Sequence, residues 1–475
     1  MSELDITGVA GLLGVSRPRV WQLRKKPDFP AARLDSKQRE YWYDHEILRW
    51  AASDGRLADK APVLFRPVPP GPAAEYFGVE AVRGGTVLKW DTAVGLVAMH
   101  FPRPSAGAGD RYLWPTPASL DVDALVVVLS TEDPWGPELE AVDAAFPDRT
   151  YEPRWTDLAR IFGTPAPWWQ SRLRRLPDMQ MWKPGARPQA IHPVPETDTS
   201  ALLQMAATEP DGTPVNATLM YLAREIQSRT DHWVARDMED VAGWADRDAI
   251  AVAGVPTEPT AEPEQPSEVV RREAWLKILA STSRLAADCV GVALQNDGGR
   301  DFPFSTLAVF QADDRGKLLA EFAARLRPTE RTAGFALFAD DMIGQTLIDP
   351  QTDLPVARSE GGTLRAAVPQ RLPALAPLAE VTLDHGGQLW IRTEDGKLWL
   401  APEQSGTGYA WGYGGSGPRA LAVLLELLLD DINSPAPDSL RGYEPSPGLL
   451  EGTRSRWPSG TTLTRAALET ARSQH

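Results

Sequence analysis

Residues 5–52, DITGVAGLLGVSRPRVWQLRKKPDFPAARLDSKQREYWYDHEILRWAA, decide the fold that we expect for the N-terminal part of this chain. The segment opens with apolar residues at helical spacing, and Gly14 ends the helix that this spacing predicts. Ser16 is a suitable N-cap for a second helix, with Pro18 in the first turn, where a missing N–H costs nothing. The apolar residues of the first helix are Ile6, Val9, Ala10 and Leu13.

The second helix combines an apolar face with a cationic one. Val20 and Leu23 are spaced to pack inward, which leaves the basic and amide side chains outside. Arginine matches guanine and glutamine matches adenine through paired hydrogen bonds, so such a helix start suits the major groove of DNA. The side chains that we expect to read bases are Arg17, Arg19, Gln22 and Arg24.

A short hairpin and a third helix are predicted next. Pro27 and Pro30 end the second helix, and strands are expected at residues 31–34 and 39–43. Asp44 is the predicted N-cap of the last helix. The buried face of that helix is expected to contain Ile47, Leu48 and Trp50.

This order of elements resembles the winged helix-turn-helix of phage excisionases, prophage activators and MerR-type regulators. The resemblance implies that residues 16–24 read the groove and that Lys37 and Arg39 of the wing contact phosphates. The alternative is a protein-interaction module with solvated charge, although only Asp28 and Asp35 interrupt the basic residues of this segment up to Arg39. The other expected phosphate contacts are Ser16, Lys25 and Lys26.

A second copy of the pattern begins at Leu158, LARIFGTPAPWWQSRLRRLPDM. Gly163 aligns with Gly14, Thr164 is a candidate cap, and Pro165 is the first residue of the expected second helix. The alternative is an ordinary helical hairpin whose tryptophans, Trp168, Trp169 and Trp182, pack in a core. The candidate second DNA site consists of Arg172, Arg174, Arg175, Lys183 and Arg187.

Size and composition set limits on the class of protein. A chain of 475 residues is expected to hold three or more domains. Its net charge of −15 predicts weak nonspecific association with DNA and strong salt dependence of specific binding. Cys289 is the only cysteine, which excludes a disulfide framework and a cysteine zinc site. We find neither a signal peptide nor an apolar run that could span a bilayer, so a cytoplasmic protein is expected.

We therefore expect a multidomain α+β protein. Its parts are an N-terminal winged helix-turn-helix, a candidate second helix-turn-helix, a mixed α+β body and a C-terminal sheet-plus-helix domain. The expected segments are a DNA-binding head (1–60), a Pro-rich linker (61–78), a small α+β module with a helix near residues 138–146 (79–149), the second helix-turn-helix (150–195), a helical segment (196–253), an acidic Pro-rich linker (254–267), an α+β domain (268–375) and the C-terminal domain (376–475).

The C-terminal domain contains the sequence WGYGGSGP at residues 411–418, directly before an apolar helix. This pattern resembles a small bacterial domain of unknown function over residues 376–472, which supplies a boundary but no mechanism. The glycines also satisfy G-x-G-x-x-G, yet the βαβ unit that a dinucleotide site needs is missing. We therefore predict a tight turn with positive φ at several glycines, and Pro418 at the start of the helix.

Catalytic patterns are sparse. The histidines show no pair at metal-ligand spacing, and Asp384–His385 has no nucleophile elbow nearby. The acid pairs Asp340–Asp341 and Asp430–Asp431 are candidates for Mg²⁺ in a nuclease, but solvated helix caps are the favoured interpretation. We predict no catalytic residue, no cofactor and no metal.

The expected function is sequence-specific binding of double-stranded DNA by a protein of a bacterium or mobile element. It would act by site occupancy, in transcriptional regulation or in organising an origin or attachment site. One alternative is a DNA-targeted nuclease or nucleotide-modifying enzyme. Another is a protein-interaction scaffold with a vestigial head. Protein partners of the acidic body and a homodimer are further expectations, and no membrane association is expected.

Overall fold

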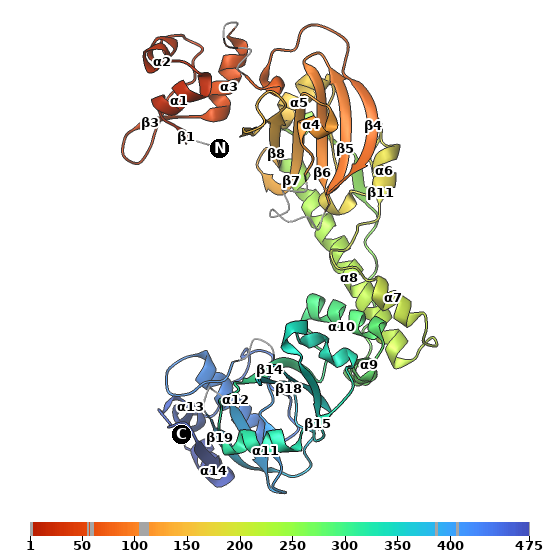
Figure 1. Cartoon of the computed structure of the whole chain (residues 1–475), viewed down its shortest axis with the longest axis vertical. Coiled ribbons are helices and arrows are strands. Elements are labelled where there is room, and N and C mark those ends of the chain that lie inside the picture. Colours follow the sequence, from red (N-terminus) through yellow and green to blue (C-terminus); the bar gives the residue numbers. More distant parts are fainter. Residues whose placement is uncertain are drawn as a thin grey trace. The chain divides into compact units, whose positions relative to one another are not determined.

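The computed structural model describes residues 3–54, 57, 61–103, 114–384, 388–404 and 408–474, without the side chains of 130–132, 297, 305 and 340. The chain is a mixed α+β protein, as predicted, and it divides into two compact units (Figure 1). The first unit combines Met1–Glu196 with Gln227–Ala261. The second combines Thr197–Ile226 with Glu262–His475.

The first unit begins with three helices and a three-stranded antiparallel sheet, and we call residues 3–54 the head. The predicted helices are present, and the expected hairpin forms between β2 and β3. The first hairpin strand is two residues shorter than expected, and β1 adds an edge strand that the sequence did not predict. The elements of the head are β1 (Glu3–Leu4), α1 (Ile6–Leu13), α2 (Arg17–Leu23), β2 (Arg33–Leu34), β3 (Glu40–Tyr43) and α3 (Asp44–Ser53).

The helix ends of the head follow the sequence signals with two differences. Gly14 ends α1 with a φ of 60°, a left-handed conformation that glycine adopts without strain. Ser16 lies at the N-cap position of α2, but its side chain makes no capping hydrogen bond. Asp44 is the first residue of α3 rather than its cap, because the chain stays extended through Tyr43.

One apolar cluster fills the head and fixes the orientation of α2. Val20 and Leu23 are 0% and 2% exposed, as the helical spacing predicted. The ring of Phe29 meets the ring of Trp50 edge-on, with centroids 4.8 Å apart. Burial of side chains of this size stabilises a fold by roughly 1.5–3 kcal/mol each. A rotation of α2 that exposed Val20 and Leu23 would therefore strongly reduce the stability of the head.

A six-stranded sheet follows in the order β4-β5-β6-β7-β8-β9. Among the described strands of this sheet, only β6 and β7 pair in parallel. The prediction of a helix near residues 138–146 is wrong, because the first six of these residues belong to strand β8. In β8 the buried residues Leu139 and Ala141 alternate with more exposed residues, as expected for a strand with one face in the core. The sequence also predicts a strand at residues 112–114, of which 112 and 113 lie outside the described residues. The strands are β4 (Glu75–Val82), β5 (Gly85–Thr92), β6 (Gly95–Pro102), β7 (Ala124–Asp133), β8 (Gly136–Asp143) and β9 (Thr150–Tyr151).

The expected linker at residues 61–78 is partly folded into this unit. Residues Val63–Phe65 form a buried 3-10 turn, η2, and the linker's last residues already belong to β4. The fully buried carboxylate of Asp143 accepts hydrogen bonds from the N–H of Val63, at 2.7 Å, and from the hydroxyl of Tyr151. Val63, Leu64 and Phe65 are apolar, so their burial stabilises the fold more than exposure to water would. The proline content of residues 61–78 predicted a linker and did not reveal this burial.

The second helix-turn-helix expected at 150–195 does not form. Its first helix is present as α5 (Trp155–Phe162), but residues Ala166–Trp168 form strand β10 instead of a second helix. Pro167 disfavours the helical conformation at the residue before it, and β10 pairs in parallel with β12 (Ile250–Val252). The tryptophans pack in the core, as in the alternative interpretation. The remaining elements are α4 (Pro117–Leu120), η4 (Ser171–Leu173), α6 (Leu176–Met181), β11 (Gln189–Ile191), η5 (Asp240–Gly243), η6 (Arg247–Ala249) and β13 (Gly254–Pro256).

Helix α8 (Pro214–Glu239) contributes residues to both units. The second unit has a helical part and an antiparallel sheet in the order β14-β18-β17-β16-β15. Its elements up to residue 369 are α7 (Ser200–Ala206), α9 (Glu268–Ala280), α10 (Arg284–Asp297), β14 (Phe304–Phe310), α11 (Lys317–Arg325), β15 (Arg327–Pro328), η7 (Ala333–Leu337), η8 (Asp340–Met342), β16 (Gln345–Asp349), β17 (Leu354–Arg358) and β18 (Leu364–Pro369).

The C-terminal segment forms a four-stranded antiparallel sheet, in the order β21-β20-β19-β22, packed with three helices. In the glycine-rich turn only Gly412 has a positive φ, of 87°, so the expectation of several such glycines is wrong for the described residues. The apolar helix begins at Ser416, two residues before Pro418. The elements are β19 (Leu378–Leu383), β20 (Leu389–Thr393), β21 (Leu398–Leu400), α12 (Ser416–Asp430), α13 (Pro447–Arg454), β22 (Thr461–Thr464) and α14 (Arg465–Arg472).

Candidate nucleic-acid interface

Helix α2 (Figure 1) contains Arg17, Arg19 and Gln22, three of the four residues predicted to read bases. Arg17 and Gln22 are exposed, and Arg19 is half-buried. The guanidinium Nη1 of Arg19 donates a hydrogen bond to Oε1 of Gln22 at 2.9 Å. This bond holds the two side chains together on the surface, where both keep further donors for a partner.

Arg24 is not free to read bases, contrary to the sequence prediction. Its two terminal nitrogens donate to the two carboxylate oxygens of Glu40, each at 2.8 Å. Its guanidinium group also lies over the rings of Trp21 and Trp42, 4.7 and 5.0 Å from their centroids. Arg24 therefore joins α2 to strand β3, a contact between residues sixteen positions apart that no local pattern predicts.

The predicted phosphate contacts also fall into two groups. Ser16, Lys25 and Lys37 are exposed, and Lys37 lies in the turn between β2 and β3. Lys26 forms a salt bridge with Asp54, and Arg39 pairs with Asp35 at 2.8 Å. The N–H and side chain of Arg39 hold the pKa of Asp35 below its ordinary value, so this acid stays ionised.

The head has a small net charge, but its basic residues are clustered along the sequence. Residues 3–54 contain nine lysines and arginines and eight acids, whereas residues 16–26 contain five basic residues and no acid. Within the described part of the chain, no carboxylate forms a salt bridge with Arg17, Arg19, Lys25 or Lys37. The charge of these four residues therefore remains available to a partner.

The candidate second site is not a continuous basic surface. The guanidinium group of Arg174 is enclosed and donates to the carbonyls of Trp169, Pro102 and Val128, at 3.3, 3.2 and 3.5 Å. Burial lowers the pKa of Arg174 to about 9. Arg174 is therefore a structural residue, which corrects its predicted role. Of the others, Arg172 pairs with Glu196, Arg175 lies 3.4 Å from Asp178, and Lys183 and Arg187 are exposed.

The head packs against the sheet within the first unit. Nη2 of Arg49, on α3, lies 2.5 Å from Oδ2 of Asp157 on α5, and the guanidinium group lies over the ring of Phe65. Nη1 of Arg149 donates to the carbonyl of Leu12 at 3.4 Å. These contacts involve α3 and the end of α1, and they leave the basic residues of α2 at the surface.

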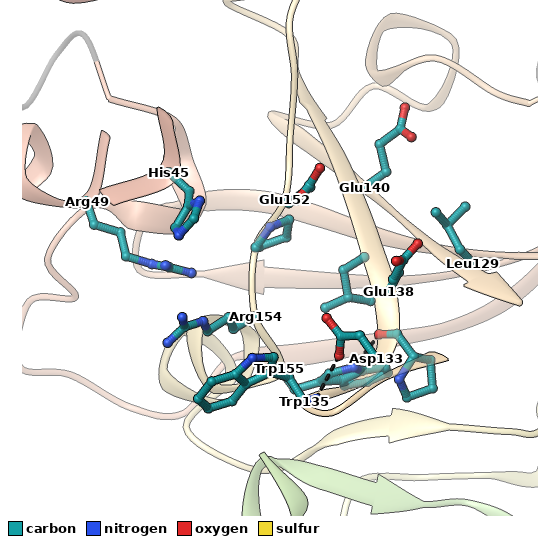
Figure 2. A pocket seen from close by; sticks show the side chains of 13 residues that line it. His45, Arg49, Leu129, Asp133, Trp135, Glu138, Glu140, Glu152, Arg154 and Trp155 are labelled. Carbon is teal, nitrogen blue, oxygen red and sulfur yellow. Dashed lines mark hydrogen bonds between the residues drawn. The ribbon is translucent and has the colours of Figure 1, made fainter. Parts of the chain in front are cut away.

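A pocket of about 280 Å³ lies beside this junction. Figure 2 shows His45 and Arg49 extending from α3, with Asp133 and Glu138 on the opposite side. The guanidinium group of Arg154 lies 4.4 Å from the centroid of the Trp135 ring. The sequence did not predict this pocket, because no motif links the residues of α3 to those of β8.

Cys289 and the acid pairs at 340–341 and 430–431 carry the chemistry of a nucleophile or of metal ligands. Burial raises the pKa of Cys289 to about 12, and its thiol donates to the carbonyl of Ala201. Asp430 pairs with Arg472 at 2.7 Å, while the side chain of Asp340 and all of His385 lie outside the described residues. No group of three or more His, Cys, Asp or Glu side chains in the described part of the chain is placed to hold a metal ion.

Two further observations concern the chain as a whole. Among the described residues, no helix is both long and apolar enough to cross a membrane. No protein-family model, curated protein or solved structure matches the chain.

Proposed function

We propose that the head is a winged helix-turn-helix and that the chain is a sequence-specific, double-stranded DNA-binding protein that acts by occupying its site. The order of elements supports this proposal: two helices joined by a short turn at Gly14, a hairpin, and a third helix that packs on the others. In this fold the second helix enters the major groove and the hairpin forms the wing.

The observation that carries the proposal is the surface of α2. Residues 16–26 contain five basic residues and no acid, and the apolar face of α2 is locked into the core of the head by Val20 and Leu23. A rigid helix that presents cations without a paired acid, here Arg17 and Arg19, matches the charge and the width of the major groove.

The structure favours a smaller set of contacts than the sequence did. Arg17, Arg19 and Gln22 would contact base edges, and Ser16, Lys25 and Lys37 would contact phosphates. Arg24, Lys26 and Arg39 would stabilise the fold of the head instead of contacting DNA, because acidic residues of the head already form salt bridges with them. Occupancy of such a site would serve control of a promoter, or the organisation of an origin or attachment site.

Selection of bound duplexes from a random pool by the full chain tests the proposal. We expect one motif to be enriched, and the double variant Arg17→Ala/Arg19→Ala to lose the enrichment. Arg83→Ala is the matched control, because Arg83 is an exposed arginine in the turn between β4 and β5. Absence of any enriched sequence with the unmodified chain would contradict the proposal.

A further inference from the structure

Trp21 is an exposed aromatic residue among the basic residues of segment 16–26. Its side chain is 52% exposed, although Val20 and Leu23 on the same helix are buried. Arg17 lies one helical turn before Trp21, so both side chains lie on neighbouring positions of the same face. Gln22 and Lys25, also exposed, flank the indole in the sequence.

The indole is held in place from one side. The guanidinium group of Arg24 lies over the rings of Trp21 and Trp42, 4.7 and 5.0 Å from their centroids, and Glu40 fixes that group through two hydrogen bonds of 2.8 Å. A side chain that is ordered before binding loses less conformational entropy when a partner arrives. The arrangement therefore presents a rigid apolar surface outward.

The surroundings of Trp21 favour DNA over an apolar protein partner. Of its exposed neighbours, Arg17, Gln22 and Lys25 are cationic or amide side chains and Pro18 is apolar, whereas the core of a protein interface is depleted of charge. In the major groove the one apolar group on a base edge is the 5-methyl group of thymine. An indole whose cationic neighbours contact the DNA backbone and the base edges is suited to apolar contact with that methyl group.

We propose that Trp21 is a specificity-determining residue that contacts the 5-methyl group of a thymine, and that Arg24 and Glu40 are positioning residues for its ring. This inference rests on the proposed function, because it assigns a base contact to the same surface. It adds a thymine preference that the basic residues alone do not supply.

The test replaces each thymine of the selected duplex, one at a time, with deoxyuracil, which removes only the methyl group. We expect the full chain to bind one of these duplexes about fourfold more weakly, the factor for one methyl group removed from water. Trp21→Ala should bind the thymine duplex at least about tenfold more weakly and should not distinguish it from the deoxyuracil duplex.

Two further variants make the result specific. Trp233→Ala removes an indole that is 67% exposed on α8, and it should keep both the affinity and the deoxyuracil effect. Glu40→Gln, which releases Arg24, should reduce the deoxyuracil effect while thermal unfolding confirms that the head is folded.

The outcomes separate the two proposals. A chain that selects no duplex overturns the proposed function and the thymine contact together. A chain that selects a duplex but shows no deoxyuracil effect, or shows the same effect after Trp21→Ala, overturns the thymine contact alone.

Discussion

At the scale of single residues, the 2.9 Å hydrogen bond between Arg19 and Gln22 is the feature most directly tied to the proposed base recognition. It orients the guanidinium group while leaving most of its donors exposed. We expect Arg19→Ala to weaken binding to the selected duplex by about 1–3 kcal/mol and to relax base preference at one position. Fluorescence anisotropy with the selected and a random duplex measures both effects. An equal loss on the two duplexes would assign Arg19 to the backbone instead.

A second residue-scale feature is the half-buried carboxyl of Glu403. Burial raises its pKa to about 7 from an ordinary value of 4.5. The folded chain therefore binds this proton more tightly than the unfolded chain, and stability falls as the pH rises from about 4.5 through 7. Solvent screening of a partly exposed group limits the loss to about 1–2 kcal/mol.

Glu403→Gln should remove this part of the pH dependence. We expect the variant and the unmodified chain to have similar unfolding free energies at pH 5, and the variant to be the more stable at pH 8. Urea denaturation at the two pH values measures the difference. Glu360→Gln, at an exposed acid, is the matched control and should follow the unmodified chain. A parallel pH dependence in both variants would argue against a raised pKa at Glu403.

At the scale of elements, Arg174 joins strands β6 and β7 to the chain that follows β10 through three backbone carbonyls. Arg174→Ala leaves those carbonyls without a donor and opens a cavity beside Phe101, so we expect it to destabilise the first unit by about 2–4 kcal/mol. Arg175→Ala, next along the chain but exposed, should change stability by less than about 0.5 kcal/mol. Thermal unfolding of the two variants gives the comparison, and equal shifts in melting temperature would contradict the structural role.

At the scale of the whole molecule, the net charge of −15 and the local excess on α2 act against each other. DNA binding should therefore depend steeply on salt, because the head must displace counterions while the acidic remainder opposes association. We expect Lys37→Gln to reduce the slope of log K against log salt by about 1, since each lost phosphate contact releases about one ion fewer.

Lys26→Gln is the matched control for that measurement. Lys26 is a lysine of the same head, but Asp54 already neutralises it. The slope for this variant should remain that of the unmodified chain. A reduced slope for Lys26→Gln with no change for Lys37→Gln would mean that DNA meets a different face of the head.

Local patterns were enough for the helices and the hairpin of the head, though not for β1. The periodic apolar residues of α1, Gly14 and Pro18 act on neighbours within a turn or two, so the sequence predicted α1, α2 and the burial of Val20 and Leu23. The same reasoning failed at Ala166–Trp168, where a strand forms because residues 250–252 provide its hydrogen-bonding partner. Local propensity cannot include a partner more than eighty positions away.

The sequence by itself therefore determined which residue types lie on α2, and with them the chemistry that its surface can perform. Only the tertiary structure decided which of those cations remain available. Within residues 16–26, Glu40 and Asp54 neutralise Arg24 and Lys26 and leave Arg17, Arg19 and Lys25 for a partner. The physical reason is that a salt bridge depends on distance in the fold, while a count of charges along the chain contains no distances.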